Sequence, residues 1–321
     1  MTRLEREKLR RDSLFYSANL IGVTVLFYLM LRMLLQAALA ALLGANLAGS
    51  GTANPAGIPV AAAMALNCAA TLVSLGLPLL LLRGGSRPLC LPPLRLAPPT
   101  PKAAAYGLPL FLCFTMAASA MTGLLKTALG AAGYTPPPAL HLPGGSGAMA
   151  LAFLAYCVLP AVLEELLFRG GIQRLLAPYG DWFAIFVTSL LFALVHTDLT
   201  QLPSVFLLSL LLGYTLAATK NLADAMLLHF ANNLSGFVLL WAQQRLDGTN
   251  AMALTAVLFA LYFGGGILAL VLLLRQGGFL RLPRWPARKN QMTRAERVLS
   301  APFFTFALLI LVLILILEAL R

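Results

Sequence analysis

Apolar runs long enough to cross a membrane are the feature that most limits the folds open to this 321-residue chain. A helix needs about 20 predominantly apolar residues to span the hydrocarbon core of a bilayer. Candidate spans lie near 14–44, 57–82, 103–125, 149–175, 182–196, 202–219, 222–242, 253–274 and 299–320. Because 60% of the residues are hydrophobic and only 11% are charged, an ordinary soluble domain is excluded. We predict an all-α polytopic membrane protein whose eight or nine transmembrane helices enclose a polar intramembrane cavity.

Two places in this pattern are irregular. Arg32 and Gln36 interrupt the first span, which is compatible with one span followed by an extra-membrane turn. Arg32 has no predicted partner, so its guanidinium is expected to snorkel toward the membrane surface. The fifth and sixth spans are short and are joined by HTDLTQLP, residues 196–203. Irregular backbone at membrane depth must be shielded from lipid, so this connection is expected to lie partly inside the protein.

The basic residues lie mostly in loops between the apolar runs, although a net charge of +12 would also suit a nucleic-acid-binding protein. Alternating spans place the N-terminal arm, the loop 83–102 and the linker 275–297 on one side, which the positive-inside rule makes cytoplasmic. The linker is expected to lie along anionic headgroups. We therefore predict a multi-pass integral membrane protein with a cytoplasmic N-terminus and with lipid, not nucleic acid, around it. The composition, rich in Ala, Leu and Gly, favours the plasma membrane of a prokaryote.

Two adjacent acids, Glu164 and Glu165, stand in the apolar run AVLEELLFRGG. Charged residues inside a membrane are costly and commonly functional. Glu165 and Arg169 are four residues apart, so they share a helix face and can form an ion pair. Glu164 points about 100° away, and its own i+4 neighbour is Phe168, so it is predicted to face a cavity. Pro160 cannot donate a backbone hydrogen bond and should loosen the helix just before these acids.

Two of the three histidines also lie in apolar runs. His229 and Asn233 are four residues apart, so both can project toward one point. Phe192 and His196 have the same spacing, which gives this histidine a supporting aromatic neighbour on its own face. Asn232 is expected to cap or pack.

Three motifs carry a resemblance to a known family. EELLFR fits EExxxR, FALVH fits FxxxH and HFANN fits HxxxN, in that order and on separate apolar runs. Over about 148–241 the chain resembles the CPBP family of CAAX proteases and bacteriocin-processing or immunity proteins, which includes the type II CAAX prenyl endopeptidase. The resemblance implies an intramembrane glutamic endopeptidase that uses no cofactor or metal.

The resemblance also implies a role for each motif residue. Glu164 and His196 would activate a water molecule. His229 and Asn233 would stabilise the oxyanion, and the Glu165–Arg169 pair would support the site. The residue types suit this chemistry, since a carboxylate beside an imidazole can exchange a proton and fixed donors can stabilise developing charge. No serine or cysteine is placed beside a histidine as a nucleophile, which favours direct attack by water.

Other functions can use the same side chains. Two histidines and a glutamate could hold a metal as in a metal-dependent protease, although no HExxH motif is present. The four cysteines, Cys68, Cys90, Cys113 and Cys157, show no paired spacing, so neither a disulfide nor a zinc site is predicted. A non-enzymatic membrane scaffold or bacteriocin-immunity protein would use the polar cluster only to specify helix packing. A transporter is disfavoured because no repeated half and no second acidic site are visible.

The resemblance divides the chain into three parts. Residues 1–147 hold the N-terminal arm and the first three transmembrane helices. Residues 148–242 form the CPBP-like catalytic core, and residues 243–321 hold the C-terminal helices with the basic cytoplasmic linker. The expected partner is a membrane-associated or lipidated peptide or protein substrate.

Overall fold

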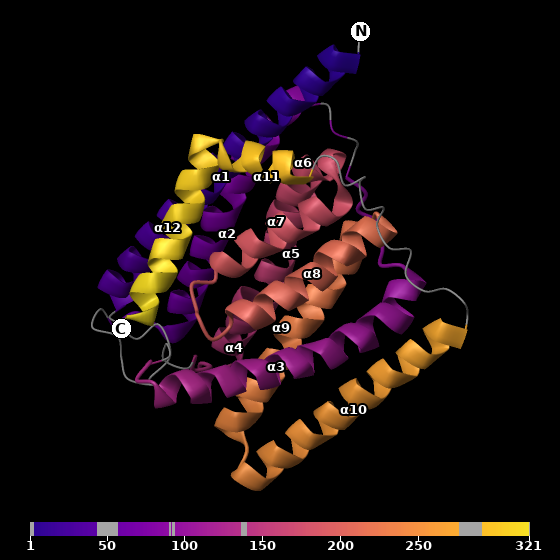
Figure 1. The fold of residues 1–321 in the computed structure, drawn as a ribbon. Coiled ribbons are helices and arrows are strands. Elements are labelled where there is room, and N and C mark those ends of the chain that lie inside the picture. The colour runs from indigo at the N-terminus through magenta and orange to yellow at the C-terminus, as the bar shows by residue number, and fades with distance from the viewer. Residues whose placement is uncertain are drawn as a thin grey trace.

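The computed structural model describes residues 3–43, 57–89, 91, 94–135, 140–275 and 291–320, and every regular element within them is helical (Figure 1). Eight helices among these described residues are long and apolar enough to cross a membrane. The predicted class, an all-α integral membrane protein, is confirmed. The apolar spans are α1 (Arg3–Leu43), α2 (Val60–Gly85), α3 (Leu108–Ala131), the composite helix from α4 to α6, α8 (Leu202–Thr219), α9 (Leu222–Arg245), α10 (Gly248–Arg275) and α12 (Pro302–Ala319).

The composite helix carries the two acids and is π-helical in two places. It begins as α4 (Ser146–Phe153), passes through a π-helical turn at Leu154–Val158, continues as α5 (Leu159–Glu164) and becomes π-helical again over Glu165–Gln173 before α6 (Arg174–Leu176). The first π-helical turn ends just before Pro160, which has no N–H to donate, so the predicted loosening lies there. Wider helical turns of this kind are frequent at functional sites.

Helix α7 (Asp181–Leu194) and the connection after it form the irregular part of the fold. At 14 residues, α7 is shorter than a membrane crossing needs. The connection to α8 is buried at Val195, Asp198 and Thr200, as predicted from its sequence. The Asp198 carboxylate accepts hydrogen bonds from the backbone N–H of Thr200 and from Gln201, which satisfies polar groups that lipid could not.

Helix α1 is continuous through Arg32 and Gln36, so the proposed break in the first span is absent. Its partner at the other end of the chain is α12, which lies alongside it in Figure 1. A side chain at Gly22 would overlap the backbone of Phe303, so the two helices meet there without an intervening side chain. The amphipathic helix α11 (Gln291–Leu299) precedes α12, and Arg297 lies over the Phe15 ring of α1.

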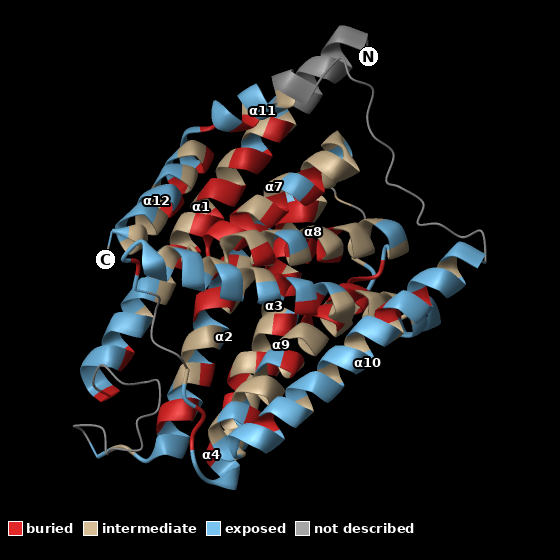
Figure 2. Cartoon of the chain, turned by 60° about the horizontal axis from the view of Figure 1, so that its bottom comes forward, coloured by how far each residue is buried: buried red, intermediate tan, exposed pale blue. Residues whose placement is uncertain are grey.

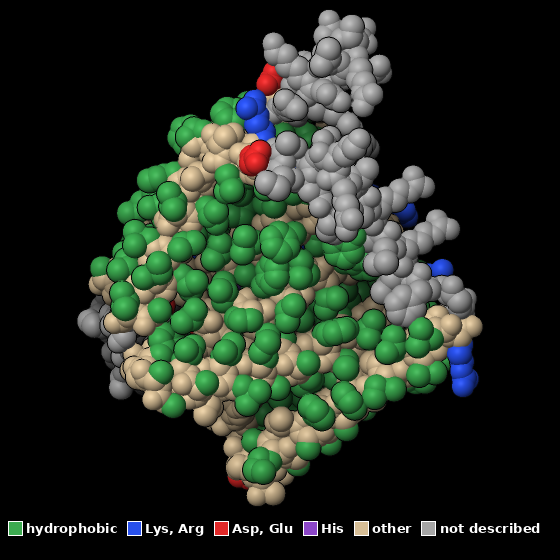
Figure 3. Space-filling model, in the orientation of Figure 1, with side chains coloured by type: hydrophobic (Ala, Val, Ile, Leu, Met, Phe, Trp, Pro, Cys, Tyr) green, Lys and Arg blue, Asp and Glu red, His purple; other side chains and the backbone are tan. Residues whose placement is uncertain are grey.

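Burial follows the pattern expected of a protein surrounded by lipid. Buried residues concentrate where α1, α7, α12 and the π-helical segment Glu165–Gln173 meet, whereas α10 is exposed along most of its length (Figure 2). Hydrophobic side chains cover most of the face shown in Figure 3, and the described charged side chains on it lie toward its edges. Cys90 and most of the predicted basic linker, 276–290, lie outside the described residues; Cys68, Cys113 and Cys157 are free thiols.

Candidate active site

The second acid of the motif, Glu165, is the centre of a fully buried polar network. Arg169 Nη1 donates to Glu165 Oε1 across 2.8 Å, and both side chains have 0% exposure. The ion pair predicted from their spacing is therefore present. Arg169 Nη2 also donates to the backbone carbonyl and hydroxyl oxygens of Ser209 on α8, at 3.2 and 2.7 Å. The pair thus joins two helices, and its buried charges stabilise each other.

His229 on α9 completes this network. Its Nδ1 lies 2.8 Å from the same oxygen, Glu165 Oε1, and a carboxylate can only accept when ionised, so Nδ1 donates. The opposite edge of the ring faces the first acid, because His229 Nε2 is 3.9 Å from Glu164 Oε2. One histidine therefore lies between the two glutamates and is oriented by Glu165.

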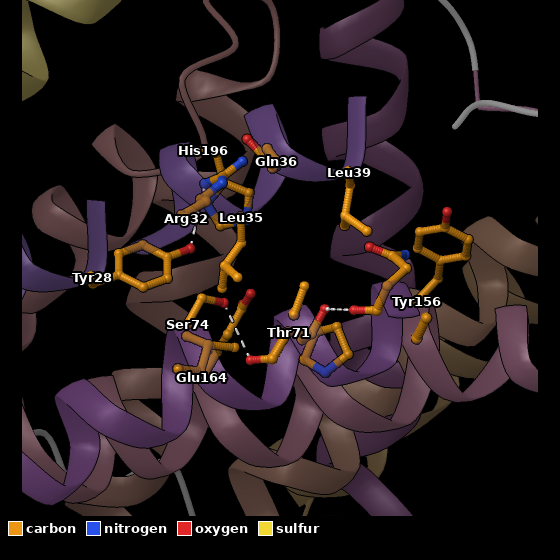
Figure 4. A pocket seen from close by; sticks show the side chains of 15 residues that line it. Tyr28, Arg32, Leu35, Gln36, Leu39, Thr71, Ser74, Tyr156, Glu164 and His196 are labelled. Atoms are coloured by element: carbon orange, nitrogen blue, oxygen red, sulfur yellow. Dashed lines mark hydrogen bonds between the residues drawn. The ribbon is translucent and has the colours of Figure 1, made fainter. Parts of the chain in front are cut away.

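A cavity of about 230 Å³ opens beside Glu164 (Figure 4). The side chains of Glu164 and His196 both line it, as the sequence analysis predicted for the acid. Most of the remaining wall comes from α1 and α2, with Tyr28, Arg32 and Ser74 among its polar members. Glu164 is thus the acid that is open to a cavity, whereas Glu165 is enclosed.

His196 follows the end of α7 and has a defined tautomer. Its Nδ1 lies 2.7 Å from the Phe192 carbonyl oxygen, which can only accept, so Nδ1 carries the hydrogen. In the neutral imidazole, Nε2 is then the basic nitrogen. Electrostatic interactions link His196 to Glu164, Arg32 and His229, which places the four groups around one region.

Phe192 is the apolar centre of the site. Its ring centroid lies 4.8 Å from that of His196, which confirms the contact expected from their spacing, and 5.9 Å from that of His229. The Arg169 guanidinium carbon is 4.3 Å from the same ring, and Phe168 packs edge-on against it at 5.0 Å. A single ring therefore contacts both histidines and the guanidinium of the buried ion pair.

Asn233 lies one turn beyond His229 on α9. Its Oδ1 accepts a hydrogen bond from Asn232 Nδ2 at 3.1 Å, and Asn232 Oδ1 accepts from Thr115 on α3. Asn232 thus packs between helices, as expected. Of the described residues, those that line the cavity include neither His229 nor Asn233. The Nδ2 group of Asn233 has no hydrogen-bond partner among the described residues, so a donor is available there.

Arg32 is the cavity residue whose position the sequence analysis missed. Instead of snorkelling to the surface, its Nη1 donates to the Val195 carbonyl oxygen at 2.5 Å and lies 3.4 Å from the Tyr28 hydroxyl. An arginine in the middle of an apolar helix was the available signal. Its partner could not be identified because Val195 contributes only its backbone.

Side chains that could bind a metal ion are not clustered in the described part of the chain. No group of three or more His, Cys, Asp or Glu side chains in the described ranges is arranged to hold a metal ion. Glu165 uses Oε1 for both Arg169 and His229, and its Oε2 has no hydrogen-bond partner among the described residues.

These features define a helical membrane protein with a buried acid–histidine site next to a cavity. The family model described as "Type II CAAX prenyl endopeptidase Rce1-like" matches residues 146–235, the part of the chain that carries all three motifs. This segment is similar to the CAAX protease family, which confirms the resemblance, and the similarity points to a membrane-embedded protease. Neither the search of curated proteins nor that of solved structures gave a match.

Proposed function

We propose that this protein is an intramembrane endopeptidase that hydrolyses a peptide bond with water activated by Glu164 and His196. The observation that carries the proposal is that these two side chains line one cavity, while the neighbouring acid Glu165 is already paired with Arg169. A carboxylate inside the membrane costs free energy, so an acid that faces a cavity there is expected to have a function. The family match supports protease activity as the class of reaction.

The proposed reaction begins with a water molecule held in the cavity by Glu164. The carboxylate takes one proton from the water, and the oxygen attacks the carbonyl carbon of the scissile bond. His196 Nε2 can accept and return a proton because its Nδ1 is occupied by the Phe192 carbonyl. The C–N bond then breaks, and the proton passes to the leaving nitrogen. No covalent enzyme intermediate is required.

His229 and Asn233 are proposed to stabilise the oxyanion formed by this attack. Supporting this role, Glu165 accepts from Nδ1 of His229 and the other edge of the ring faces Glu164, so Nε2 donates to the oxyanion when the ring carries both protons, and Asn233 keeps a donor group available. Donors fixed before the reaction stabilise developing charge without reorganisation. Since neither residue lines the cavity, the substrate must approach α9 more closely than the cavity alone allows.

The proposed substrate is a membrane-associated or lipidated peptide. The cavity lies between apolar helices, and its wall includes Leu35, Leu39 and Leu75 as well as polar groups. Because this wall comes from α1 and α2, the catalytic core proposed for 148–242 is not complete without the first 147 residues. We further propose that the N-terminus is cytoplasmic and that the protein resides in a prokaryotic plasma membrane, from the distribution of basic loops and the composition.

Comparing the peptide termini in cells that carry wild-type or Glu164→Gln protein tests this function. The expected result is a set of termini present with the wild type and lost with the variant, at equal amounts of folded protein. Ser74→Ala is the matched control, because Ser74 lines the same cavity but bonds only to Thr71 of its own helix among the described residues. A contrary result would be identical peptide termini with the wild type and Glu164→Gln, together with equal binding of a partner or equal protection of the cells. That result would favour a scaffold or immunity function over an enzyme.

A further inference from the structure

Arg32 places a positive charge in the wall of the cavity. The residue comes from the middle of α1, outside the segment that matches the family model. The guanidinium points toward the loop that carries His196, because its Nη1 donates to the carbonyl oxygen of the preceding residue, Val195. Figure 4 shows Arg32 next to His196 in the cavity.

Most of the donors of this guanidinium are unused. Arginine has five N–H groups, and the two contacts of Arg32, with Val195 and Tyr28, both involve Nη1. Nε and Nη2 have no hydrogen-bond partner among the described residues. No acid in the described ranges forms an ion pair with Arg32 either, in contrast to Arg169, which pairs with Glu165. A half-buried cation at membrane depth with no anionic partner among the described residues calls for an anionic ligand.

We propose that Arg32 binds a carboxylate of the substrate, close to the bond that is cut. The inference rests on the proposed function, because the ligand is taken to be the peptide that occupies the cavity. Carboxylates are the only anionic groups that an unmodified peptide normally carries at neutral pH. The planar guanidinium fork matches a carboxylate with two parallel hydrogen bonds.

The position of Arg32 limits where this carboxylate lies. Val195 and His196 are neighbours in the chain, so the tether at Val195 fixes the guanidinium beside the catalytic histidine. Tyr28 interacts electrostatically with both Arg32 and Glu164, so the cation and the proposed catalytic acid both lie near one tyrosine. A bound carboxylate would therefore lie within a few residues of the scissile bond. It can be the C-terminal carboxylate or the side chain of an acidic residue.

A purely structural role would have a different consequence. If Arg32 only braces the loop through Val195, its removal displaces His196 and slows the cleavage of every substrate alike. If it binds a carboxylate, its removal slows the cleavage of substrates that carry one more than the cleavage of their neutral counterparts. Measuring the cleavage of matched acidic and neutral substrates by each variant separates these roles.

The test uses the full-length protein in liposomes and a short apolar fluorogenic peptide made in four forms. Two forms differ only in a C-terminal acid or amide, and two differ only in an internal Glu or Gln. We expect the wild type to prefer one carboxylate form over its neutral counterpart by about 10- to 100-fold in kcat/KM, mainly through KM. The preferred pair identifies the source of the carboxylate.

The variants are Arg32→Gln, Arg32→Lys and the control Arg83→Gln, which removes an equal charge from the exposed end of α2. Arg32→Gln should abolish the preference, so that each acidic peptide is cleaved no faster than its neutral counterpart, and Arg32→Lys should retain part of it. The control should keep the preference in full. Equal cleavage of all four peptides by the wild type, or an equal loss for all four in Arg32→Gln, would overturn the assignment and leave the proposed hydrolysis intact.

A binding measurement tests the role of Arg32 independently of catalysis. The same peptides are titrated against the Glu164→Gln protein with and without Arg32→Gln. A carboxylate preference that Arg32→Gln removes supports the binding site even if the wild type cleaves nothing, in which case only the hydrolysis proposal fails. Equal affinities for all forms overturn the binding site.

Discussion

The Nδ1 atom of His229 lies 2.8 Å from Oε1 of Glu165, a contact between residues 64 positions apart in the chain. The same oxygen accepts a hydrogen bond from Arg169, so one buried carboxylate holds a cation and a histidine. Its neighbour Glu164 reaches a cavity instead. Adjacent residues of identical chemistry thus have different environments, and the helix rotation of about 100° between them is the cause.

Replacing Glu165 should damage the fold, whereas replacing Glu164 should not. Glu165→Gln leaves the buried Arg169 without its counter-charge, and such a loss costs about 3–5 kcal/mol. Glu164→Gln removes no ion pair with an arginine and should leave the free energy of unfolding nearly unchanged. Thermal unfolding of the two purified variants in one detergent measures the difference. Equal stability of the two proteins would show that Glu165 is not the structural acid.

Asn233 should matter for turnover and its neighbour Asn232 for packing. Removing one oxyanion donor lowers kcat by about 100- to 1,000-fold, which is the effect expected of Asn233→Ala. Asn232→Ala loses the contact with Thr115 between α9 and α3, so it should lower stability more than kcat. Steady-state kinetics and unfolding of both variants test this division. A normal kcat in Asn233→Ala would remove Asn233 from the catalytic group.

Phe192 should be needed to position both histidines. Its ring contacts His196, His229 and Arg169, and a displacement of about 1 Å in a catalytic group can lower the rate by up to about 100-fold. Phe192→Leu keeps an apolar side chain but removes the flat surface. The control is Phe186→Leu on the same helix, where the ring is exposed and packs on Phe206. Similar kcat values for the two variants would contradict a positioning role.

Proteolysis should continue in the presence of a metal chelator. The proposed reaction uses water activated by a carboxylate and an imidazole, so no bound ion is consumed or required. The assay compares purified protein before and after prolonged treatment with a chelator, followed by the addition of zinc. Activity that disappears with the chelator and returns specifically with zinc would favour the metal-dependent alternative.

Contacts within one helix could be predicted from the sequence, and contacts between helices could not. The i,i+4 spacing correctly paired Glu165 with Arg169 and Phe192 with His196, because neighbouring turns have a fixed geometry. The apolar runs likewise located the spans and the buried connection before α8. These features depend on local geometry and hydropathy alone.

The arrangement of the site depends on helix packing that no spacing rule encodes. The bond from His229 to Glu165 and the bond from Arg32 to Val195 each join distant segments. Arg32 was expected at the surface because a backbone carbonyl leaves no signal in the sequence. The catalytic roles proposed for Glu164, His196, His229 and Asn233 stay predictions. The structure places Glu164 and His196 at the cavity and His229 beside Glu164.

The central claim is that Glu164 activates the water that cuts the peptide bond, and purified protein in liposomes tests it most directly. The measurement is the rate at which new peptide termini form with the wild type and with Glu164→Gln, at equal folded protein and equal thermal stability. Loss of a general base predicts a rate lower by about 100- to 10,000-fold in the variant. Cleavage by Glu164→Gln at the wild-type rate would contradict the account.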